Sequence, residues 1–503
     1  MVDKKCLFKT SIQIIIVNFI VIVLTLHAHG IQEPLDAREE KLGKIHNDAE
    51  QSIVSSNGLH YAYFTYYRLL FNPDQIQVAL VRNGEEKGVY DNVGKDSIIF
   101  SPDGHHLAFA AMKNNKWFVI VDDEEIGSYD GIGKIVFSPD GLRFAFTGHR
   151  NKEWHLVLDG RHGTAHDEVA GDSIVFSPNS KRIAYAAVTE GKWSTVIDGK
   201  ETGQYDGIGG LCFSLDSKRV AIGVMKDKKW FIILDGKEGS RYDGVGEICF
   251  SSDSKRYAYL AGKSGKFLVI TDGIAGPEFD RINKGVLTFS PEGSRIAYWA
   301  VKGDKGVVVC DGLVETTYDG VEYLSFSPDG THLAYAAIKG KQYLFVLDGK
   351  ELNIGDFDGI RYDSVVFSQD SKHYAYHAKK NQKDFIIVDE KRGKEYDGLF
   401  KGEPIFIPYK NKVAYTARKG EKQVVVVDTT ESQGFDEVGK LVFSPDGEHV
   451  AYMARNKKKW FVVIDNSIGK EYDKIIQNGP VFRSNKNIEF LAVRDNILYR
   501  VTQ

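Results

Sequence analysis

Proline and cysteine are scarce in this chain of 503 residues, which contains 12 Pro and 4 Cys. Such low numbers exclude a collagen-like or proline-rich protein and a disulfide-stapled scaffold. The formal net charge is only -4, so the chain as a whole lacks the basic excess of a nucleic-acid-binding protein. Glycine is abundant, with 50 residues, and 42% of all residues are hydrophobic. Many glycines beside few prolines indicate tight turns between short strands rather than disorder.

The N-terminus has the pattern of a signal peptide. Three lysines within the first nine residues precede an apolar run from Ile12 to Leu26, and Ala28 and Gly30 occupy the -3 and -1 positions of a cleavage site. The run has 15 residues, fewer than the roughly 20 of a membrane-spanning helix. We therefore predict a signal peptide over residues 1–30, an N-terminal segment over 31–53, and a periplasmic or secreted protein. An uncleaved membrane anchor is the alternative.

Three cysteines follow this segment, namely Cys212, Cys249 and Cys310. Cys212 and Cys249 each stand just before a Phe-Ser pair, at a place that Val, Ile, Thr or Ser fills elsewhere in the chain. We interpret them as small core residues rather than as a disulfide. An odd number of cysteines in an exported protein also allows a free thiol.

One unit repeats through nearly all of the remaining chain. Phe-Ser-Pro-Asp-Gly occurs at 100–104, 137–141, 326–330 and 443–447, and variants of it recur every 37 to 41 residues. These positions divide residues 54–503 into twelve units, the first enlarged to 46 residues and the last cut short. A fixed period of this length is the signature of a repeat architecture.

Each unit contains the signals of four short strands. The first strand ends in Phe-Ser, Ser-Pro-Asp-Gly then predicts a type I turn, and the second strand carries an Ala-aromatic pair. The third strand is an apolar run that often ends at Asp-Gly, a strong hairpin signal because both residues need positive φ. The fourth ends in an aromatic-Asp pair, as in Tyr242-Asp243, which recurs eleven times. We expect its ring to pack between neighbouring sheets and its Asp to accept backbone N–H groups.

Four strands in about 38 residues, with no helical period, predict an all-β chain built from β-propeller blades. One such sheet cannot bury both faces alone, so the blades must stack around an axis. Because propellers typically have four to eight blades, twelve units favour two tandem propellers, over residues 54–288 and 289–503. One large ring is the alternative, and no Pro/Gly/Ser-rich linker marks the boundary.

The succession of Phe-Ser-Pro-Asp-Gly, Ala-Tyr and Asp-Gly resembles the WD40-like repeat of the TolB-like β-propeller family. The resemblance covers all twelve units, although the aromatic-Asp pair departs from the family pattern. Members often serve as periplasmic or secreted interaction platforms, so the resemblance implies a non-enzymatic binding scaffold. Some TolB-like propellers are polysaccharide lyases, which leaves a lyase or hydrolase with its site at a propeller mouth as the alternative.

No catalytic motif accompanies the repeats. The chain has no Gly-x-Ser-x-Gly, no His-Glu-x-x-His, no phosphate-binding loop of the P-loop type and no EF-hand loop. His149, His155, His162 and His166 fall within one unit, at a loop, a strand, a turn and a strand end. We interpret them as ordinary surface and core residues, and we predict no catalytic residue, no metal site and no cofactor.

Charge is distributed unequally among the turns. In a four-stranded blade, the turn between the second and third strands and the connection to the next blade open on one face, and the other two turns open on the opposite face. A count over the ten units that begin at Phe100 gives about +9 for the first face and about -12 for the second. The sequence therefore predicts a basic face and an acidic face.

Tryptophan follows the basic turn in five units, where it could stack on a sugar ring or contact an acidic partner. The alternative is that Trp covers the outer core while Lys keeps the surface soluble. We expect the partner to be a protein or an anionic envelope polymer, and not a nucleic acid. The candidate binding residues are Lys116, Trp117, Trp154, Lys192, Trp193, Lys229, Trp230, Arg455, Lys457, Lys458, Lys459 and Trp460.

Overall fold

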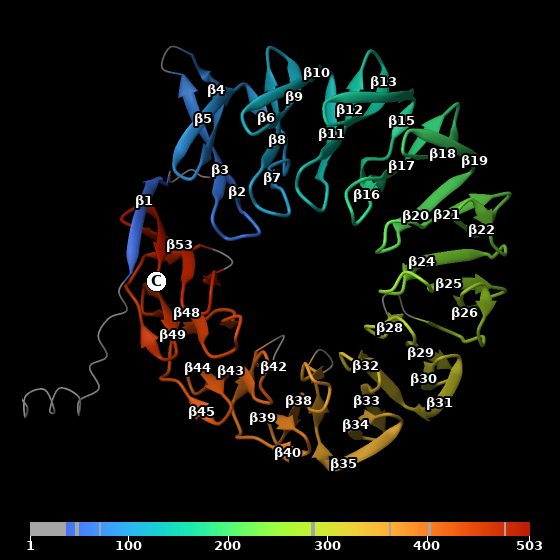
Figure 1. Cartoon of the computed structure of the whole chain (residues 1–503), viewed down its shortest axis with the longest axis vertical. Helices are drawn as coiled ribbons and strands as arrows, with labels where there is room; N and C mark the ends of the chain where they lie inside the picture. Colours follow the sequence, from blue (N-terminus) through green and yellow to red (C-terminus); the bar gives the residue numbers. More distant parts are fainter. Residues whose placement is uncertain are drawn as a thin grey trace, which may run out of the picture.

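Twelve small antiparallel sheets follow one another around a single ring in this computed structural model (Figure 1). The structure describes residues 37–45, 50–69, 72–282, 287–361, 364–400, 404–476 and 479–503. In these ranges no helix is long and apolar enough to cross a membrane. The predicted signal peptide, residues 1–30, lies outside the described residues and stays a prediction.

Each sheet is one blade, with its innermost strand listed first; six blades have an innermost strand interrupted into two short pieces. Blades 1 to 4 are β2 (Glu50–Val54), β3 (Tyr61–Leu69), β4 (Asn72–Arg82), β5 (Glu85–Tyr90); β6 (Asn92–Val93), β7 (Ile99–Phe100), β8 (Leu107–Lys113), β9 (Lys116–Val121), β10 (Glu124–Tyr129); β11 (Gly131–Phe137), β12 (Phe144–Arg150), β13 (Glu153–Leu158), β14 (Arg161–His166); and β15 (Glu168–Val169), the 3-10 turn η1 (Gly171–Ser173), β16 (Val175–Phe176), β17 (Ile183–Thr189), β18 (Lys192–Ile197), β19 (Lys200–Tyr205).

Blades 5 to 8 are β20 (Gly207–Phe213), β21 (Val220–Lys226), β22 (Lys229–Leu234), β23 (Lys237–Glu238); β24 (Gly244–Phe250), β25 (Tyr257–Lys263), β26 (Lys266–Thr271), β27 (Ile274–Ala275); β28 (Thr288–Phe289), β29 (Ile296–Lys302), β30 (Lys305–Cys310), β31 (Leu313–Tyr318); and β32 (Gly320–Phe326), β33 (Leu333–Lys339), β34 (Gln342–Leu347), β35 (Lys350–Phe357).

Blades 9 to 12 are β36 (Gly359–Ile360), β37 (Val366–Phe367), β38 (Tyr374–Lys380), β39 (Lys383–Val388), β40 (Lys391–Arg392); β41 (Gly398–Leu399), β42 (Ile405–Phe406), β43 (Val413–Lys419), β44 (Lys422–Val427), β45 (Thr430–Glu431); β46 (Glu437–Val438), β47 (Val442–Phe443), β48 (Val450–Asn456), β49 (Lys459–Ile464), β50 (Ser467–Ile468); and β51 (Lys474–Ile475), β52 (Val481–Phe482), β53 (Ile488–Arg494), β54 (Ile497–Thr502) with β1 (Arg38–Lys44).

The turns have the conformations that the repeat predicts. In blade 2 the N–H of Gly104 donates to the carbonyl of Ser101 at 2.8 Å, which closes the Ser-Pro-Asp-Gly turn. The Asp-Gly turns have positive φ at both residues, for example 50° at Asp159 and 77° at Gly160. These are type I′ turns, whose twist matches that of the flanking strands.

The shortened last unit is completed by the N-terminal segment. β1 pairs antiparallel with β54 and supplies the outermost strand of blade 12, and Figure 1 shows it beside the C-terminal sheet. Arg494 donates to both carboxylate oxygens of Glu39, at 3.0 and 2.8 Å, and the Tyr472 hydroxyl donates to Glu39 at 2.7 Å. Strands from the beginning and the end of the described residues therefore share one sheet and close the ring. The repeat pattern did not reveal this pairing, because β1 contains no part of the motif.

The structure takes the alternative arrangement, one ring, rather than two propellers in tandem. At the boundary favoured from the sequence, blade 6 and blade 7 share a continuous apolar core in which Val269 packs with Phe279 and Tyr298. Blade 12 packs in turn on blade 1, where Leu491 and Tyr63 belong to one cluster. In the described residues, the contact at this boundary and the contact that closes the ring are therefore of the same kind, an apolar cluster shared by neighbouring blades.

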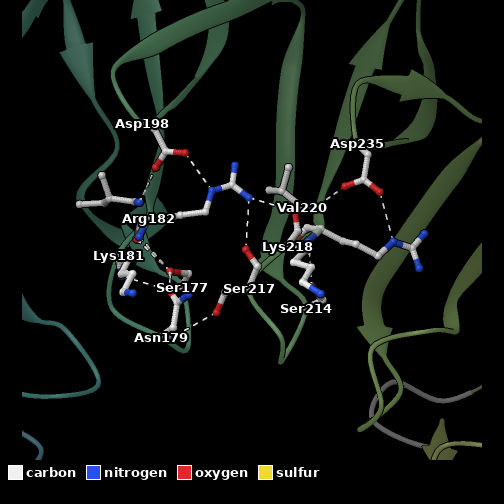
Figure 2. A network of polar contacts seen from close by, with 12 residues as sticks. Ser177, Asn179, Lys181, Arg182, Asp198, Ser214, Ser217, Lys218, Val220 and Asp235 are labelled. Atoms are coloured by element: carbon white, nitrogen blue, oxygen red, sulfur yellow. Dashed lines mark hydrogen bonds and ion pairs between the residues drawn. The ribbon is translucent and has the colours of Figure 1, made fainter.

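A polar network joins neighbouring blades on the face of the first-to-second and third-to-fourth turns, which we call the opposite face (Figure 2). Arg182 donates to the Asp198 carboxylate of its own blade at 2.9 Å and to the carbonyls of Ser217 and Lys218 in the next blade, at 3.3 and 3.1 Å. Equivalent Arg-Asp pairs recur in blades 3 to 7. Much of the acidic charge predicted for this face is therefore engaged in structure.

The cysteines are core residues, as the sequence indicated. Cys212, Cys249 and Cys310 are free thiols. Cys212 is partly buried against the apolar cluster between blades 5 and 6. Cys249 is partly buried against the cluster between blades 6 and 7. Burial raises the pKa of the Cys212 thiol to about 12 and those of Cys249 and Cys310 to about 11. Thiols held in this protonated form are poor nucleophiles.

Candidate binding face

The basic face is formed by the turns between second and third strands together with the connections between blades. Its geometry depends on the Asp of each aromatic-Asp pair. Asp243, at the end of blade 5, accepts from the Lys229 ammonium of its own blade at 2.5 Å and from the backbone N–H of Ser264 in blade 6 at 2.7 Å. One carboxylate thus ties the third strand of one blade to the hairpin turn of the next.

We call these residues the clamp aspartates. At eleven interfaces within the described part of the chain they accept the backbone N–H of the next blade's second-to-third turn. The expected role as a backbone acceptor is confirmed, although the donor lies in that hairpin and not in the connection itself. Eight also bind a lysine from the start of the third strand: Asp130, Asp206, Asp243, Asp280, Asp319, Asp397, Asp436 and Asp473.

Each of these clamp aspartates forms a surface ion pair with the lysine of its own blade. The hydrogen bond from Lys192 lowers the pKa of the Asp206 carboxyl below its ordinary value, and Asp206 in turn raises the pKa of Lys192. Asp243 and Asp473 show the same lowering beside Lys229 and Lys459. Both partners therefore stay charged, and they neutralise each other at neutral pH.

The ring of the aromatic-Asp pair lies between blades, as expected. Tyr242 is 8% exposed and meets Tyr259 of the next blade edge to face, with ring centroids 6.4 Å apart. Phe279 on Tyr298 and Tyr318 on Tyr335 repeat this contact. Edge-to-face packing is a favoured geometry for aromatic pairs, so the aromatic-Asp motif helps to hold neighbouring blades of the propeller together.

Four of the candidate binding lysines turn out to be clamp residues. Lys116, Lys192, Lys229 and Lys459 form ion pairs with the clamp aspartates of their own blades. A count of charges by turn could not reveal this pairing. The sequence nevertheless contains a pattern that indicates these ion pairs, because a lysine recurs 14 residues before the Asp of the aromatic-Asp pair.

The tryptophans are half-buried beneath the same turns. Trp154, Trp193 and Trp460 each pack against the apolar cluster that joins their blade to the next. Trp230 lies over Gly207 and Gly209 of its own innermost strand. Trp117 packs in the same way and also lines a pocket of about 550 Å³ between blades 2 and 3, together with Lys95, Asp96 and Lys134.

Blade 11 brings five of the candidate residues together on one hairpin, β48–β49. Arg455 donates to Glu437 at 3.0 Å and lies over the Trp460 ring, 5.7 Å from its centroid. Lys457 and Lys458 form the tip, where Lys457 has a φ of 55°. Neither of their ammonium groups forms an ion pair with a described residue, whereas Lys459 binds Asp473 at 2.6 Å.

Other tip lysines on this face likewise form no ion pair with a described residue. They are exposed and lie at or beside the second-to-third turns of blades 3, 5, 6, 7 and 8. These residues are Lys152, Lys228, Lys263, Lys302 and Lys341. The candidate residues do not converge on one centre, because their blades are spread around the ring; the basic face is a rim of separate hairpin tips.

Sheet topology and repeat motif together decide the fold. The chain is a twelve-bladed β-propeller. With β1 completing the C-terminal blade, each of the twelve sheets in the described ranges has at least four strands.

The chain is distantly similar to several solved structures. The propeller is similar to a eukaryotic initiation factor, with 15% identity over 63% of this chain and 90% of that one and a TM-score of 0.35. It is similar to TolB from Acinetobacter baumannii, with 15% identity, 52% and 77% coverage and a TM-score of 0.25. The β-propeller domain of the Trilobed protease from Pyrococcus furiosus gives 15% identity, 54% and 97% coverage and a TM-score of 0.27. No protein-family model and no curated protein matches the chain.

The histidines of blade 3 do not form a metal centre. The rings of His155 and His162 are 5.3 Å apart, and His162 shares a hydrogen bond of 3.3 Å with the Tyr129 hydroxyl. His166 takes the place of the Tyr in the aromatic-Asp pair and is buried, 3.1 Å from the Thr189 hydroxyl. Across the described ranges of the propeller, no group of three or more His, Cys, Asp or Glu side chains is placed to hold a metal ion.

Proposed function

We propose that the chain is an exported, non-enzymatic propeller scaffold whose basic face binds an anionic partner. The partner is an acidic protein surface or an anionic envelope polymer. The fold itself supports a binding role, and the location and partner are the finer parts of the proposal.

The proposal rests on the observation that the lysines of the basic face fall into two sets, one that forms ion pairs with clamp aspartates and one that does not. One set, represented by Lys229 and Lys459, is engaged by clamp aspartates. The other set, represented by Lys457 and Lys458, stands at hairpin tips with no ion pair in the described structure. Because lysines neutralise eight of the eleven clamp aspartates, the exposed tip lysines leave this face with a net positive charge. The tips are held by backbone hydrogen bonds, so this charge is presented on rigid supports.

Export is supported by the signal-like run at the N-terminus. Cleavage after Gly30 would leave the closing strand β1, which begins at Arg38, intact. We expect the native protein to begin near Ile31, as determined by N-terminal sequencing. Recovery of the intact Met1 end in the soluble cytosolic fraction would contradict export.

The binding face is tested by reversing charge where no structure depends on it. Lys457→Glu with Lys458→Glu should slow association with polyaspartate or polygalacturonate about tenfold at low salt, because exposed charges act mainly on the association rate. Wild-type binding should weaken steeply towards physiological salt, where charges are screened over about 8 Å. Biolayer interferometry measures both effects, and the two polyanions separate a protein-like from a polysaccharide-like partner.

A matched control changes the same charge on the opposite face. Lys200 and Lys237 are exposed at third-to-fourth turns and form no ion pair with a described residue. Lys200→Glu with Lys237→Glu should leave association nearly unchanged, and both double variants should melt like the wild type. Equal loss in the two variants would show that only net charge matters and would refute a binding face.

A further inference from the structure

Blade 6 differs from all other blades at one position of its second strand. The register of the hairpins places Gly262 opposite Phe267, where other blades pair a larger residue with the third strand. In the other eleven blades the position is occupied by Tyr66, Met112, His149, Val188, Met225, Val301, Ile338, Lys379, Arg418, Arg455 and Val493.

The neighbouring blade shows what the missing side chain does. In blade 5, Met225 lies against Gly207 of the innermost strand, 3.3 Å from where a Cβ of that glycine would be, and Trp230 lies beside it. In blade 6 the corresponding Gly244 has no such neighbour within 4 Å. The space that Met225 fills in blade 5 is therefore open in blade 6.

A pocket of about 400 Å³ occupies this place on the basic face. Its walls are mainly apolar and include Val245, Leu260, Phe267 and Ile282. Phe267 is 41% exposed, although it stands where five other blades have a half-buried tryptophan. An exposed aromatic ring beside an open apolar hollow is a typical recognition site for a partner's side chain.

The rim of the pocket is positively charged. Asp243 lies at the rim, but its carboxylate is engaged by Lys229 and by the N–H of Ser264. Lys266 is paired with its own clamp aspartate, and Lys263 forms no ion pair with a described residue. The rim therefore favours an apolar group that is flanked by carboxylates.

We propose that this pocket binds an aromatic side chain within an extended acidic segment of another protein. The ring of that residue lies on Phe267 and fills the space above Gly262, while a neighbouring carboxylate meets Lys263. This inference rests on the proposed function and assigns its partner to the protein class. It places the specific anchor in blade 6 and leaves the other tip lysines a general electrostatic role.

The test compares two synthetic peptides, an acidic octapeptide with one central phenylalanine and the same peptide with alanine instead. Fluorescence anisotropy should show at least tenfold tighter binding of the phenylalanine peptide to the full chain. Gly262→Met, which installs the residue found in blade 5, should remove this preference and weaken binding at least tenfold. A Cβ on Gly262 would lie 3.8 Å or more from its neighbours, and its φ is not in the left-handed region, so the variant should fold.

Val188→Met is the matched control, because it enlarges the same position in blade 4, where valine already stands. It should bind both peptides like the wild type. Lys263→Glu should weaken binding of the phenylalanine peptide while leaving the melting temperature unchanged. Equal binding of the two peptides, or full binding by Gly262→Met, overturns the proposal. Self-association that Gly262→Met abolishes would assign the pocket to a second copy of the chain and likewise overturn it.

Failure here and failure of the proposed function give different results. If the phenylalanine peptide binds as expected but Lys457→Glu with Lys458→Glu leaves polyanion binding intact, the general basic face is wrong and the pocket stands. If the polyanions bind as proposed but the peptide preference is absent, the scaffold stands without this anchor.

Discussion

Replacing Glu39 with lysine is expected to lower the free energy of unfolding by about 3 kcal/mol or more, because it breaks a largely buried, bidentate ion pair. Beside the backbone pairing of β1 with β54, Glu39 accepts side-chain hydrogen bonds from Arg494 and Tyr472 of blade 12. Its side chain is only 16% exposed, so the introduced lysine would face Arg494 with little water between them. Loss of β1 would also expose the edge of β54 to unwanted pairing.

Chemical denaturation followed by tryptophan fluorescence measures this effect, and size-exclusion chromatography reports aggregation of opened rings. Glu40→Lys is the matched control, because Glu40 pairs with Arg500 but is 60% exposed and should contribute less than about 1 kcal/mol. Combining Glu39→Lys with Arg494→Glu should recover part of the stability. An unchanged unfolding curve for Glu39→Lys would mean that β1 does not close the ring.

Truncation of the interface aromatic, Tyr242→Ala, should cost about 3 kcal/mol or more, as for other large core deletions. The ring is almost fully buried between blade 5 and blade 6 and contacts Tyr259 edge to face. Tyr242→Phe keeps the ring and should melt within a few degrees of the wild type. Thermal melts of the two variants decide the role. A normal melt of the alanine variant, together with lost partner binding, would reassign the motif from architecture to function.

The blade, its turns and the packing of the aromatic-Asp ring could all be predicted from the sequence, because each depends on contacts within one repeat or between adjacent repeats. Ser-Pro-Asp-Gly and Asp-Gly specify backbone conformations locally. Because the unit is repeated twelve times, the contact between adjacent blades recurs around the propeller. Closure of the propeller by β1, in contrast, depends on a contact between residues far apart in the sequence. β1 pairs with a strand more than 450 residues away, and no local pattern in Arg38–Lys44 indicates that partner.

The ion pairs of the basic face could not be predicted from the sequence, for a related reason. A sum of charges by turn treats Lys229 and Asp243 as independent, whereas the fold places them 2.5 Å apart. Lys457 and Lys458, by contrast, are exposed, because a two-residue turn projects its side chains outward whatever the neighbouring blade does. Gly262 was recognisable only after the hairpin register showed which residues occupy the same position in other blades.

The central claim, that partners approach the basic face, is tested most directly by lysine footprinting. The native chain is acetylated with and without bound polyaspartate, and the modified residues are quantified by mass spectrometry. We expect protection of tip lysines such as Lys152, Lys228 and Lys458, and no change at Lys200 and Lys237 on the opposite face. Equal protection on both faces, or protection confined to Lys200 and Lys237, would contradict the account.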